Sequence, residues 1–242
     1  YYGYGRVNAY KALRLLQMDV YPPSVYLKTP PFSTNQTTSE TFKLSWGGSD
    51  PEPASGIAYY DVKYREAGSP VWINYRWHTT ATSAYFTGEQ GKTYYFSVTA
   101  TDLAGNVSSA KTKFTVIPID QSSPAVSFSG AWYNTKIYYS RFFKGFAKYS
   151  GKKGAKLNFS FSQAGALRLI ITKRPIGGLA KVWLNGVKVA TIDFYSPTVQ
   201  RRVPVLVKRF SPAASGNLTV TVLHAKNPLS SGYRVEIDGI AV

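Results

Sequence analysis

The sequence contains no cysteine, so neither disulfide bonds nor thiolate metal ligands support its fold. That absence in a chain of 242 residues is more typical of a large bacterial exoprotein than of a small eukaryotic secreted module. No apolar run approaches the roughly 20 residues that cross a bilayer, so we expect no membrane insertion. The chain opens on Tyr1-Tyr2-Gly3 without Met or the apolar core of a signal peptide, and we expect it to begin inside a longer protein.

Acidic residues are also scarce, and their scarcity is uneven along the chain. Residues 1–118 carry 11 Lys and Arg against eight Asp and Glu, whereas residues 119–242 carry 18 against four. The 14 excess positive charges repel one another in the compact state, and together they attract polyanions. The second half is therefore predicted to bind something acidic.

A helix is predicted only at residues 6–17, where Val7, Tyr10, Leu13 and Leu16 recur every third position. Pro22 and Pro23 cannot continue it, and short alternating runs follow. Seven strands typical of an immunoglobulin-like sandwich are predicted at residues 24–27, 41–46, 57–65, 71–77, 83–87, 93–101 and 110–116.

After a turn-rich linker at residues 118–124, strand patterns resume and continue to the end of the chain. Asn185-Gly186 supplies the two positive φ angles of a type I′ turn and predicts a hairpin between residues 181–184 and 187–192. Further strands are predicted at residues 157–161, 167–172, 203–207, 218–222 and 233–237. The predicted fold class is therefore mainly β, with two consecutive antiparallel β-sandwiches, the second a jelly-roll, preceded by one short α-helix.

The run Gly3-Tyr4-Gly5-Arg6-Val7-Asn8-Ala9 resembles the closing helix of the bacterial subtilisin-like (S8) peptidase domain. Residues 41–109 resemble fibronectin type III or immunoglobulin-like modules of exported enzymes, through Trp46, Tyr60-Asp61-Val62 and the run Tyr94-Tyr95-Phe96 before Asp102. The last segment is similar to galactose-binding-like jelly-roll domains of exoenzymes, through Gly130-Ala131-Trp132, Leu184-Asn185-Gly186 and Ile237-Asp238-Gly239. These resemblances imply a peptidase remnant at residues 1–20, a fibronectin-like sandwich at 21–118 and a basic carbohydrate-binding-like jelly-roll at 119–242.

The peptidase resemblance implies that the catalytic Ser, His and Asp lie before residue 1, so this chain is predicted not to be an enzyme. His78 and His224 are interpreted as packing or rim residues, because neither has an acidic or nucleophilic partner nearby in sequence. Loops holding Asp50 with Glu52 and Asp102 with Asn106 meet at one end of the expected sandwich, where calcium is an alternative to Asx-turn hydrogen bonds. The Asx interpretation is preferred, and neither metal nor cofactor is predicted.

Cations and aromatic residues alternate from Trp132 to Lys156, although half of these aromatic side chains are needed for a core. Other cationic clusters are Lys173-Arg174 and Arg201-Arg202 with Lys208-Arg209. From loops and strand ends, the predicted ligand-binding residues are Trp132, Tyr133, Lys173, Arg174, Tyr195 and Tyr233.

The predicted function is to tether a secreted or cell-surface serine endopeptidase to an anionic polysaccharide or cell-wall polymer. Its predicted partners are that polymer and the upstream peptidase domain. Three alternatives stay open: a surface adhesin or carbohydrate-binding protein, a nucleic-acid-binding module, and a C-terminal extension that only stabilises the protease.

Overall fold

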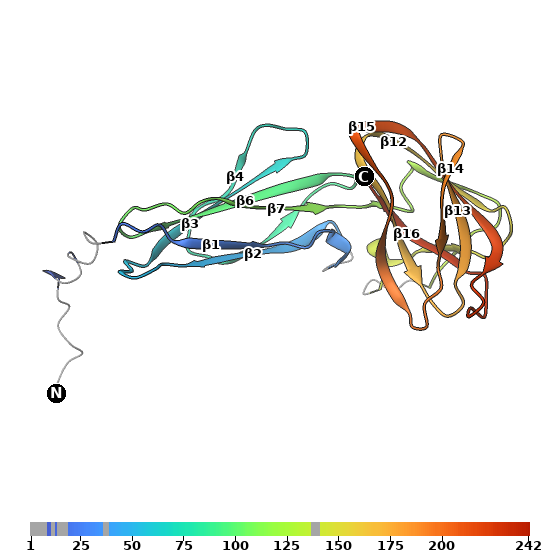
Figure 1. Cartoon of the computed structure of the whole chain (residues 1–242), viewed down its shortest axis with the longest axis horizontal. Coiled ribbons are helices and arrows are strands. Elements are labelled where there is room, and N and C mark those ends of the chain that lie inside the picture. The colour runs from blue at the N-terminus through green and yellow to red at the C-terminus, as the bar shows by residue number, and fades with distance from the viewer. Residues whose placement is uncertain (1–8, 11–12, 14–18, 36–38, 137–140) are drawn as a thin grey trace. The chain divides into compact units, whose positions relative to one another are not determined.

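Antiparallel strands make up most of the chain in the computed structural model, which describes residues 9–10, 13, 19–35, 39–136 and 141–242 (Figure 1). The mainly β prediction is confirmed. The helix predicted at residues 6–17 falls almost entirely outside the described residues. Within the described part, no helix has the length and apolarity needed to span a bilayer.

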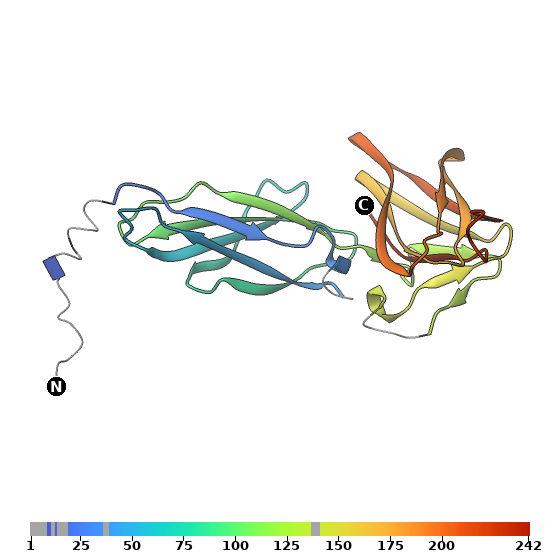
Figure 2. The ribbon, with the colours of Figure 1, turned by 60° about the horizontal axis from the view of Figure 1, so that its bottom comes forward.

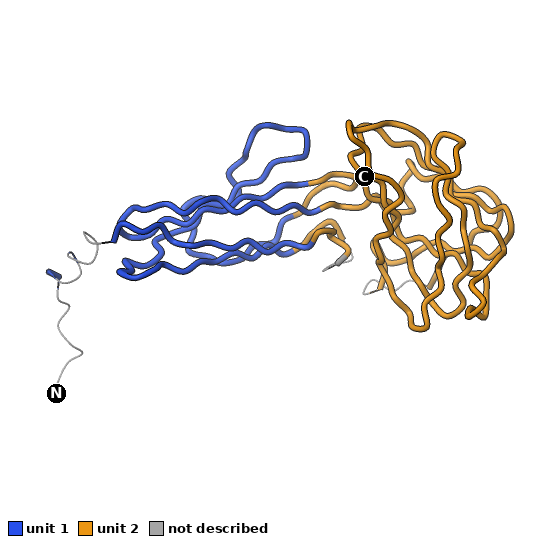
Figure 3. The backbone as a smooth tube through the Cα atoms, viewed as in Figure 1, with its two compact units in different colours: residues 1–30, 43–86, 94–115 blue, residues 31–42, 87–93, 116–242 orange. Residues whose placement is uncertain are grey.

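The chain divides into two compact units (Figure 3). The first comprises residues 1–30, 43–86 and 94–115, and the second comprises residues 31–42, 87–93 and 116–242. Two short segments that precede residue 119 therefore belong to the second unit.

Each of the seven strands predicted before residue 118 is present, in two sheets ordered β1-β2-β5 and β4-β3-β6-β7. A 3₁₀ turn, η1 (Ser33–Asn35), lies between the first two strands. The strands are β1 (Ser24–Lys28), β2 (Thr41–Ser49), β3 (Ile57–Glu66), β4 (Ile73–Thr79), β5 (Ser83–Thr87), β6 (Thr93–Asp102) and β7 (Lys111–Val116).

Alternating burial along these strands explains their assembly. In β2, Phe42, Leu44 and Trp46 are at most 1% exposed, while the intervening residues are more accessible. Val62 of β3 and Phe96 of β6 are fully buried in the same way. Successive side chains of a strand point to opposite faces, and each such side chain stabilises the fold by about 1.5–3 kcal/mol when it leaves water.

The second unit contains one continuous, strongly curved sheet ordered β10-β11-β16-β12-β15-β13-β14, with β8 on β16 and β9 on β12. Figure 1 and Figure 2 show these strands, yellow to red, curving around a common interior. A short turn, η2 (Phe143–Gly145), precedes β11. The strands are β8 (Ile119–Asp120), β9 (Val126–Ser129), β10 (Tyr133–Asn134), β11 (Lys148–Ser150), β12 (Lys156–Lys173), β13 (Gly178–Leu184), β14 (Val187–Asp193), β15 (Gln200–Lys226) and β16 (Val235–Ala241).

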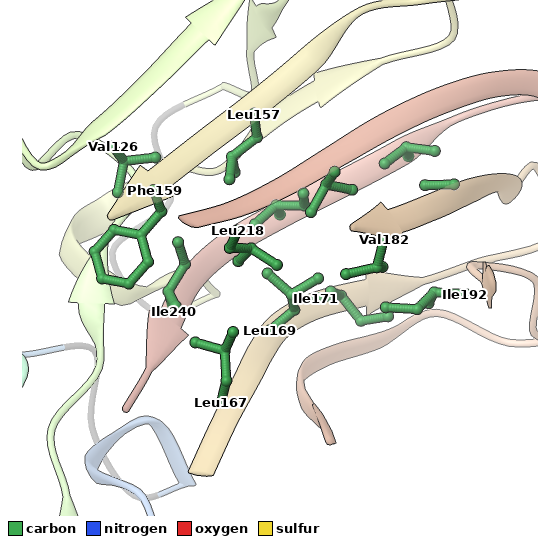
Figure 4. Close-up of a cluster of buried hydrophobic side chains, with 14 of the residues drawn as sticks. Val126, Leu157, Phe159, Leu167, Leu169, Ile171, Val182, Ile192, Leu218 and Ile240 are labelled. Carbon is green, nitrogen blue, oxygen red and sulfur yellow. The ribbon is translucent and has the colours of Figure 1, made fainter. Parts of the chain in front are cut away.

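The long strands β12 and β15 serve two parts of this sheet. The start of β12 pairs with β9 and the end of β15, whereas its second half pairs with β16 and the start of β15. Register shifts separate the two halves, around Gln163 with a positive φ of 50°. Figure 4 shows the core that the curved sheet encloses, where Leu157, Leu169 and Leu218 converge.

The hairpin predicted at Asn185-Gly186 is confirmed. Their φ angles are 49° and 79°, and β13 pairs with β14 on either side of the turn. This geometry matches the right-handed twist of the flanking strands, which is why Asn-Gly is selected there.

Candidate anion-binding pocket

A pocket of about 330 Å³ lies in the second unit, and five of the side chains around it are cationic. Its lining comes from the β10 to β11 segment, the end of β12, the start of β15 and the approach to β16. The lining residues are Asn134, Thr135, Lys136, Arg141, Phe142, Tyr149, Arg174, Arg201 and Arg234.

Strand β16 supplies the buried acid beside this pocket. Val235 and Ile237 point into the hydrophobic core, so alternation directs Glu236 to the opposite face of the strand. Glu236 is nevertheless fully buried, and its backbone pairs with Tyr149 of β11, which lines the pocket. A buried carboxylate requires cationic partners, because its desolvation is otherwise very costly.

Two arginines share the Glu236 carboxylate. Arg174 donates from Nη2 to Oε1 at 2.8 Å, and Arg234 donates from Nε to Oε2 at 2.7 Å. Both side chains retain some solvent exposure, at 16% for Arg174 and 22% for Arg234. Charge-assisted hydrogen bonds of this length fix both guanidinium groups. The carboxylate therefore orients two cations while neutralising only one charge.

The backbone around Arg174 is held by close packing at Gly177. A Cβ atom at that position would lie 2.0 Å from the carbonyl oxygen of Phe194, so only glycine fits. The Gly177 amide donates to the Arg174 carbonyl, and the Arg174 amide donates to the Phe194 carbonyl, each at 2.9 Å. The loop therefore places Arg174 rigidly at the edge of the sheet.

Arg234 is fixed from a second direction by an aromatic ring. Its guanidinium carbon lies 3.5 Å from the centroid of the Tyr149 ring, and its backbone amide donates to the Ile176 carbonyl at 2.9 Å. A planar guanidinium stacks well on an aromatic face, and this contact adds to the pairing with Glu236.

Hydrogen-bond donors remain unused at the pocket. Among the described residues, the buried Nε atoms of Arg174 and Arg201 lack a hydrogen-bond partner. Burial lowers the pKa of Arg174 from its ordinary value. The positive charges of Arg234 and Arg201 lower this pKa further, whereas Glu236 raises it. Clustered cations are suited to an anionic group, because its negative charge would reduce their mutual repulsion.

Two further acids of the second unit are buried, and burial raises the pKa of both. The pKa of Asp238 lies well above its ordinary value, although its carboxylate accepts the Phe143 amide at 3.1 Å. The pKa of Asp120 is raised as well, despite hydrogen bonds from Ser122. Burial therefore favours the neutral form of both acids.

The structure places the six predicted binding residues at different distances from this pocket. Among the described residues, Arg174 is the member of that set that lines it. Tyr195 forms an isolated parallel β-bridge with Arg174. Lys173 is the last residue of β12 and immediately precedes Arg174. The Tyr133 ring lies 5.7 Å from that of Tyr149.

Trp132 and Tyr233 belong elsewhere in the second unit. Trp132 packs against the hydrophobic core, with its ring 5.0 Å from that of Phe128. Tyr233 stacks on His224 at 4.1 Å, with the Lys226 ammonium 5.4 Å from its ring. A position near a strand end, on which both predictions depend, does not distinguish an inward from an outward side chain.

Four other cations at the pocket were not among the six predicted residues. Lys136, Arg141 and Arg201 belong to basic runs recognisable in the sequence. Arg234 has no other cation beside it in the sequence. The pattern that could have identified it is its i, i+2 spacing with Glu236, which places both side chains on one face of a strand.

The two histidines make packing contacts, and one of them also lies near an acid from another strand. His224 Nδ1 lies 2.8 Å from the Gly151 carbonyl oxygen. His78 stacks on Trp77 at 4.6 Å, but its Nε2 also lies 4.0 Å from Asp61. Asp61 belongs to the adjacent strand β3, so His78 has an acidic neighbour in space although it has none nearby in sequence.

Three carboxylates meet at one end of the first unit, where Asp19, Asp50 and Asp102 have oxygens within 4.8 Å of one another. Asp102 accepts the Asn106 amide at 2.8 Å and Asp50 accepts the Gly56 amide at 2.6 Å. Both carboxylates accept loop amides, but these amides lie four and six residues further on, whereas an Asx turn bonds an amide two residues on. Asp19 was not part of that prediction.

No family model and no curated protein matches the sequence. Solved structures with a similar arrangement include a family 35 carbohydrate-binding module from Clostridium thermocellum, at 18% identity and a TM-score of 0.34, covering 50% of this chain and 94% of that one. A carbohydrate-binding module of the β-sandwich superfamily has 14% identity and a TM-score of 0.41, covering 91% and 98%. An α-L-rhamnosidase from Aspergillus terreus has 13% identity and a TM-score of 0.41, covering 89% of this chain and 26% of its own. At these values the likenesses do not assign the chain to a family.

Proposed function

We propose that this chain is a non-catalytic accessory region that binds an anionic polysaccharide through the basic pocket of its second unit. The observation that carries the proposal is the trio of Arg174, Arg234 and Glu236, in which one buried carboxylate fixes two guanidinium groups at the pocket. An acidic sugar residue offers the complementary group, because a planar carboxylate accepts two parallel hydrogen bonds from a guanidinium.

The charge distribution supports a polymeric ligand. Residues 119–242 contain four acidic residues, and Asp120, Glu236 and Asp238 are at most 1% exposed. The surface of this segment is therefore almost entirely positive. Such a surface attracts a polyanion over a distance of about 10 Å at 0.1 M salt, and the pocket then holds one residue of it.

A polysaccharide is favoured over nucleic acid by the concave shape of the site. Binding to nucleic acid that is independent of sequence relies on many phosphate contacts spread along a surface. Here the fixed cations converge on a space of about 330 Å³, lined also by the Tyr149 ring. That combination suits a single sugar residue with an acidic substituent.

The parent protein in this proposal is a secreted subtilisin-like serine endopeptidase, and the first unit is a fibronectin-type spacer. The peptidase is supported by the sequence Gly3-Tyr4-Gly5-Arg6-Val7-Asn8-Ala9, and the spacer by seven strands in sheets of three and four. A surface adhesin or a stabilising extension would share the same fold. Sequencing the gene upstream of residue 1 separates the adhesin from the two protease-linked cases, since a protease parent requires a coding region for the Ser, His and Asp triad. Deleting residues 119–242 separates tethering from stabilisation, since loss of thermal stability with unchanged surface retention favours the stabilising extension.

The ligand class is tested by affinity electrophoresis of the full chain in gels that contain polygalacturonate, a teichoic-type polymer, neutral galactan or double-stranded DNA. We expect retardation by an acidic carbohydrate polymer and none by neutral galactan. Retardation should weaken between about 0.05 and 0.5 M NaCl, because salt screens the attraction.

Retardation by DNA alone would replace the polysaccharide with a nucleic acid. Salt-insensitive retardation by the neutral polymer, or no retardation in any gel, would refute the proposal.

A further inference from the structure

A groove of about 420 Å³ lies on the outward surface of strands β12, β15 and β13, and shares no residue with the basic pocket. Its lining is Lys156, Trp183, Gly186, Thr219 and Thr221. Val182 and Leu184 enter the hydrophobic core, so alternation along β13 turns Trp183 away from it.

The groove exists because the middle strand carries short side chains. Strand β15 lies between β12 and β13 and contributes Thr219 and Thr221 to this surface. Thr221 is paired with Lys156 on one side and Lys181 on the other, and Thr219 is paired with Trp183. Longer side chains therefore flank a row of threonines, which leaves a trough along β15.

The floor of the trough offers an ordered row of polar groups. Thr219 donates from Oγ1 to Asn158 Oδ1 at 2.9 Å, and Ser160 donates from Oγ to Asn217 Oδ1 at 2.7 Å. Both pairs join β12 to β15 across the outward surface. At one end of the trough, Gly186 leaves open space, since a Cβ there would meet nothing within 4 Å.

We infer that this groove is a second glycan subsite, in which Trp183 stacks on a pyranose ring of an acidic polysaccharide. The indole presents a flat apolar face beside hydroxyl and amide groups, which matches the apolar face and hydroxyl edge of a sugar. Lys156 lines the groove and Lys181 is the neighbour of Thr221 on β13, and in this proposal their ammonium groups bind the carboxylate of that sugar.

The acidic character of this ligand rests on the proposed function, whereas the stacking on Trp183 does not. Two subsites on one unit would raise the avidity for a polymer, because the second contact becomes intramolecular. A short oligosaccharide would engage the groove without this gain, which allows the groove to be tested by itself.

The test is a titration of the ¹⁵N-labelled full chain with trigalacturonate, followed by NMR through the indole N–H signals of its five tryptophans. Trp183→Phe assigns the Trp183 signal, and Trp77, which is 55% exposed on the first unit, serves as the internal control. We expect a saturable shift of the Trp183 signal, no shift of the Trp77 signal, and a Kd about tenfold weaker in Lys156→Ala/Lys181→Ala.

The same titration on Arg201→Ala separates the two sites, since Arg201 lines the basic pocket and not the groove. A Trp183 shift that persists in Arg201→Ala supports an independent subsite. A Trp183 signal unmoved at roughly 10 mM trigalacturonate, while the polymer still retards the wild-type chain, refutes the groove and leaves the pocket standing. An equal shift with neutral galactotriose refutes the acidic ligand of the groove.

Discussion

At the scale of single residues, Glu236 decides how the basic pocket is built. It is fully buried and bonded to both Arg174 and Arg234, so the two guanidinium groups are held close together in spite of their like charge. The geometry that suits the pocket to an anion therefore depends on a residue that has the same charge as the ligand.

Replacing this acid tests that role in stability. Glu236→Gln leaves two partly buried cations without a counter-charge, and we expect the free energy of unfolding in urea to fall by about 3 kcal/mol. Glu89→Gln is the matched control, because that carboxylate is 77% exposed and pairs with Lys92 on the surface. The control should change stability by less than about 0.5 kcal/mol. Equal effects of the two substitutions would show that Glu236 has no special structural role.

Asp238 predicts a pH dependence with a definite sign. Its pKa is raised in the folded protein by burial, so the native state holds this proton more tightly than the unfolded chain does. Its contribution to stability is present in full below its ordinary pKa of 3.8 and is lost as the pH rises through the raised value.

Asp238→Asn removes this titration and can retain a hydrogen bond from the Phe143 amide. We expect its Tm to exceed that of the wild type at pH 8, and the difference to shrink as the pH falls towards 4. Differential scanning calorimetry across this range measures both. A variant that is less stable than the wild type at pH 8 would contradict the burial argument.

At the scale of elements, the loop between β12 and β13 places Arg174, and Gly177 is its tightest point. Gly177→Ala forces the loop away from Phe194, so we expect a loss of several kcal/mol together with loss of polymer binding. Gly165→Ala is the matched control, because Gly165 lies within β12 and a Cβ there meets nothing within 4 Å. Thermal unfolding should show a large fall in Tm for Gly177→Ala alone, and similar Tm values for the two variants would refute the packing argument.

The sequence predicted where strands occur better than it predicted which neighbouring runs belong to one long strand. The seven strands of the first part and the Asn185-Gly186 hairpin followed from alternation and turn chemistry. In the second unit, two predicted runs merged into β12 and two into β15. The bulges near Gln163 bend β12 without ending it, and a strand that bends through a bulge looks in sequence like two strands.

At the scale of the whole molecule, segments on both sides of residue 119 belong to the second unit. Phe32 and Val116 form a small buried cluster with Ile170 and Ala241, and Arg168 lies 5.5 Å from the Phe32 ring. A domain boundary at residue 119, as the linker composition predicts, would leave this cluster incomplete.

A fragment of residues 119–242 should therefore be less stable than the same residues within the full chain. Ile170 and Ala241 are fully buried and would lose their contacts with Phe32 and Val116, at a cost of about 3 kcal/mol. Urea unfolding monitored by hydrogen exchange of β12 and β16 amides measures the difference. Equal protection in the fragment and the full chain would show that residues 31–42 and 116 are dispensable.

The sequence was sufficient to propose an acidic ligand, but not to assemble the candidate site. The charge excess after residue 119 predicted an acidic ligand, whereas the pocket joins cations from four distant segments. Arg174 was predicted from its loop, but Arg234 has no cationic neighbour in sequence and depends on β16 pairing with β11. Long-range strand pairing of this kind is not encoded in local patterns.

The central claim, that fixed cations in the pocket bind the polymer, is tested most directly by comparing Arg201→Ala with Arg209→Ala. Arg201 lines the pocket but, unlike Arg174 and Arg234, is not one of the two arginines bonded to Glu236, while Arg209 is an exposed arginine of the same strand β15. Both variants lose one positive charge, so calorimetric titration with polygalacturonate isolates the effect of position. We predict a Kd at least tenfold weaker for Arg201→Ala, equivalent to about 1.4 kcal/mol, and a change of less than about twofold for Arg209→Ala. Equal weakening in the two variants would show that binding follows net charge alone, and would contradict a pocket.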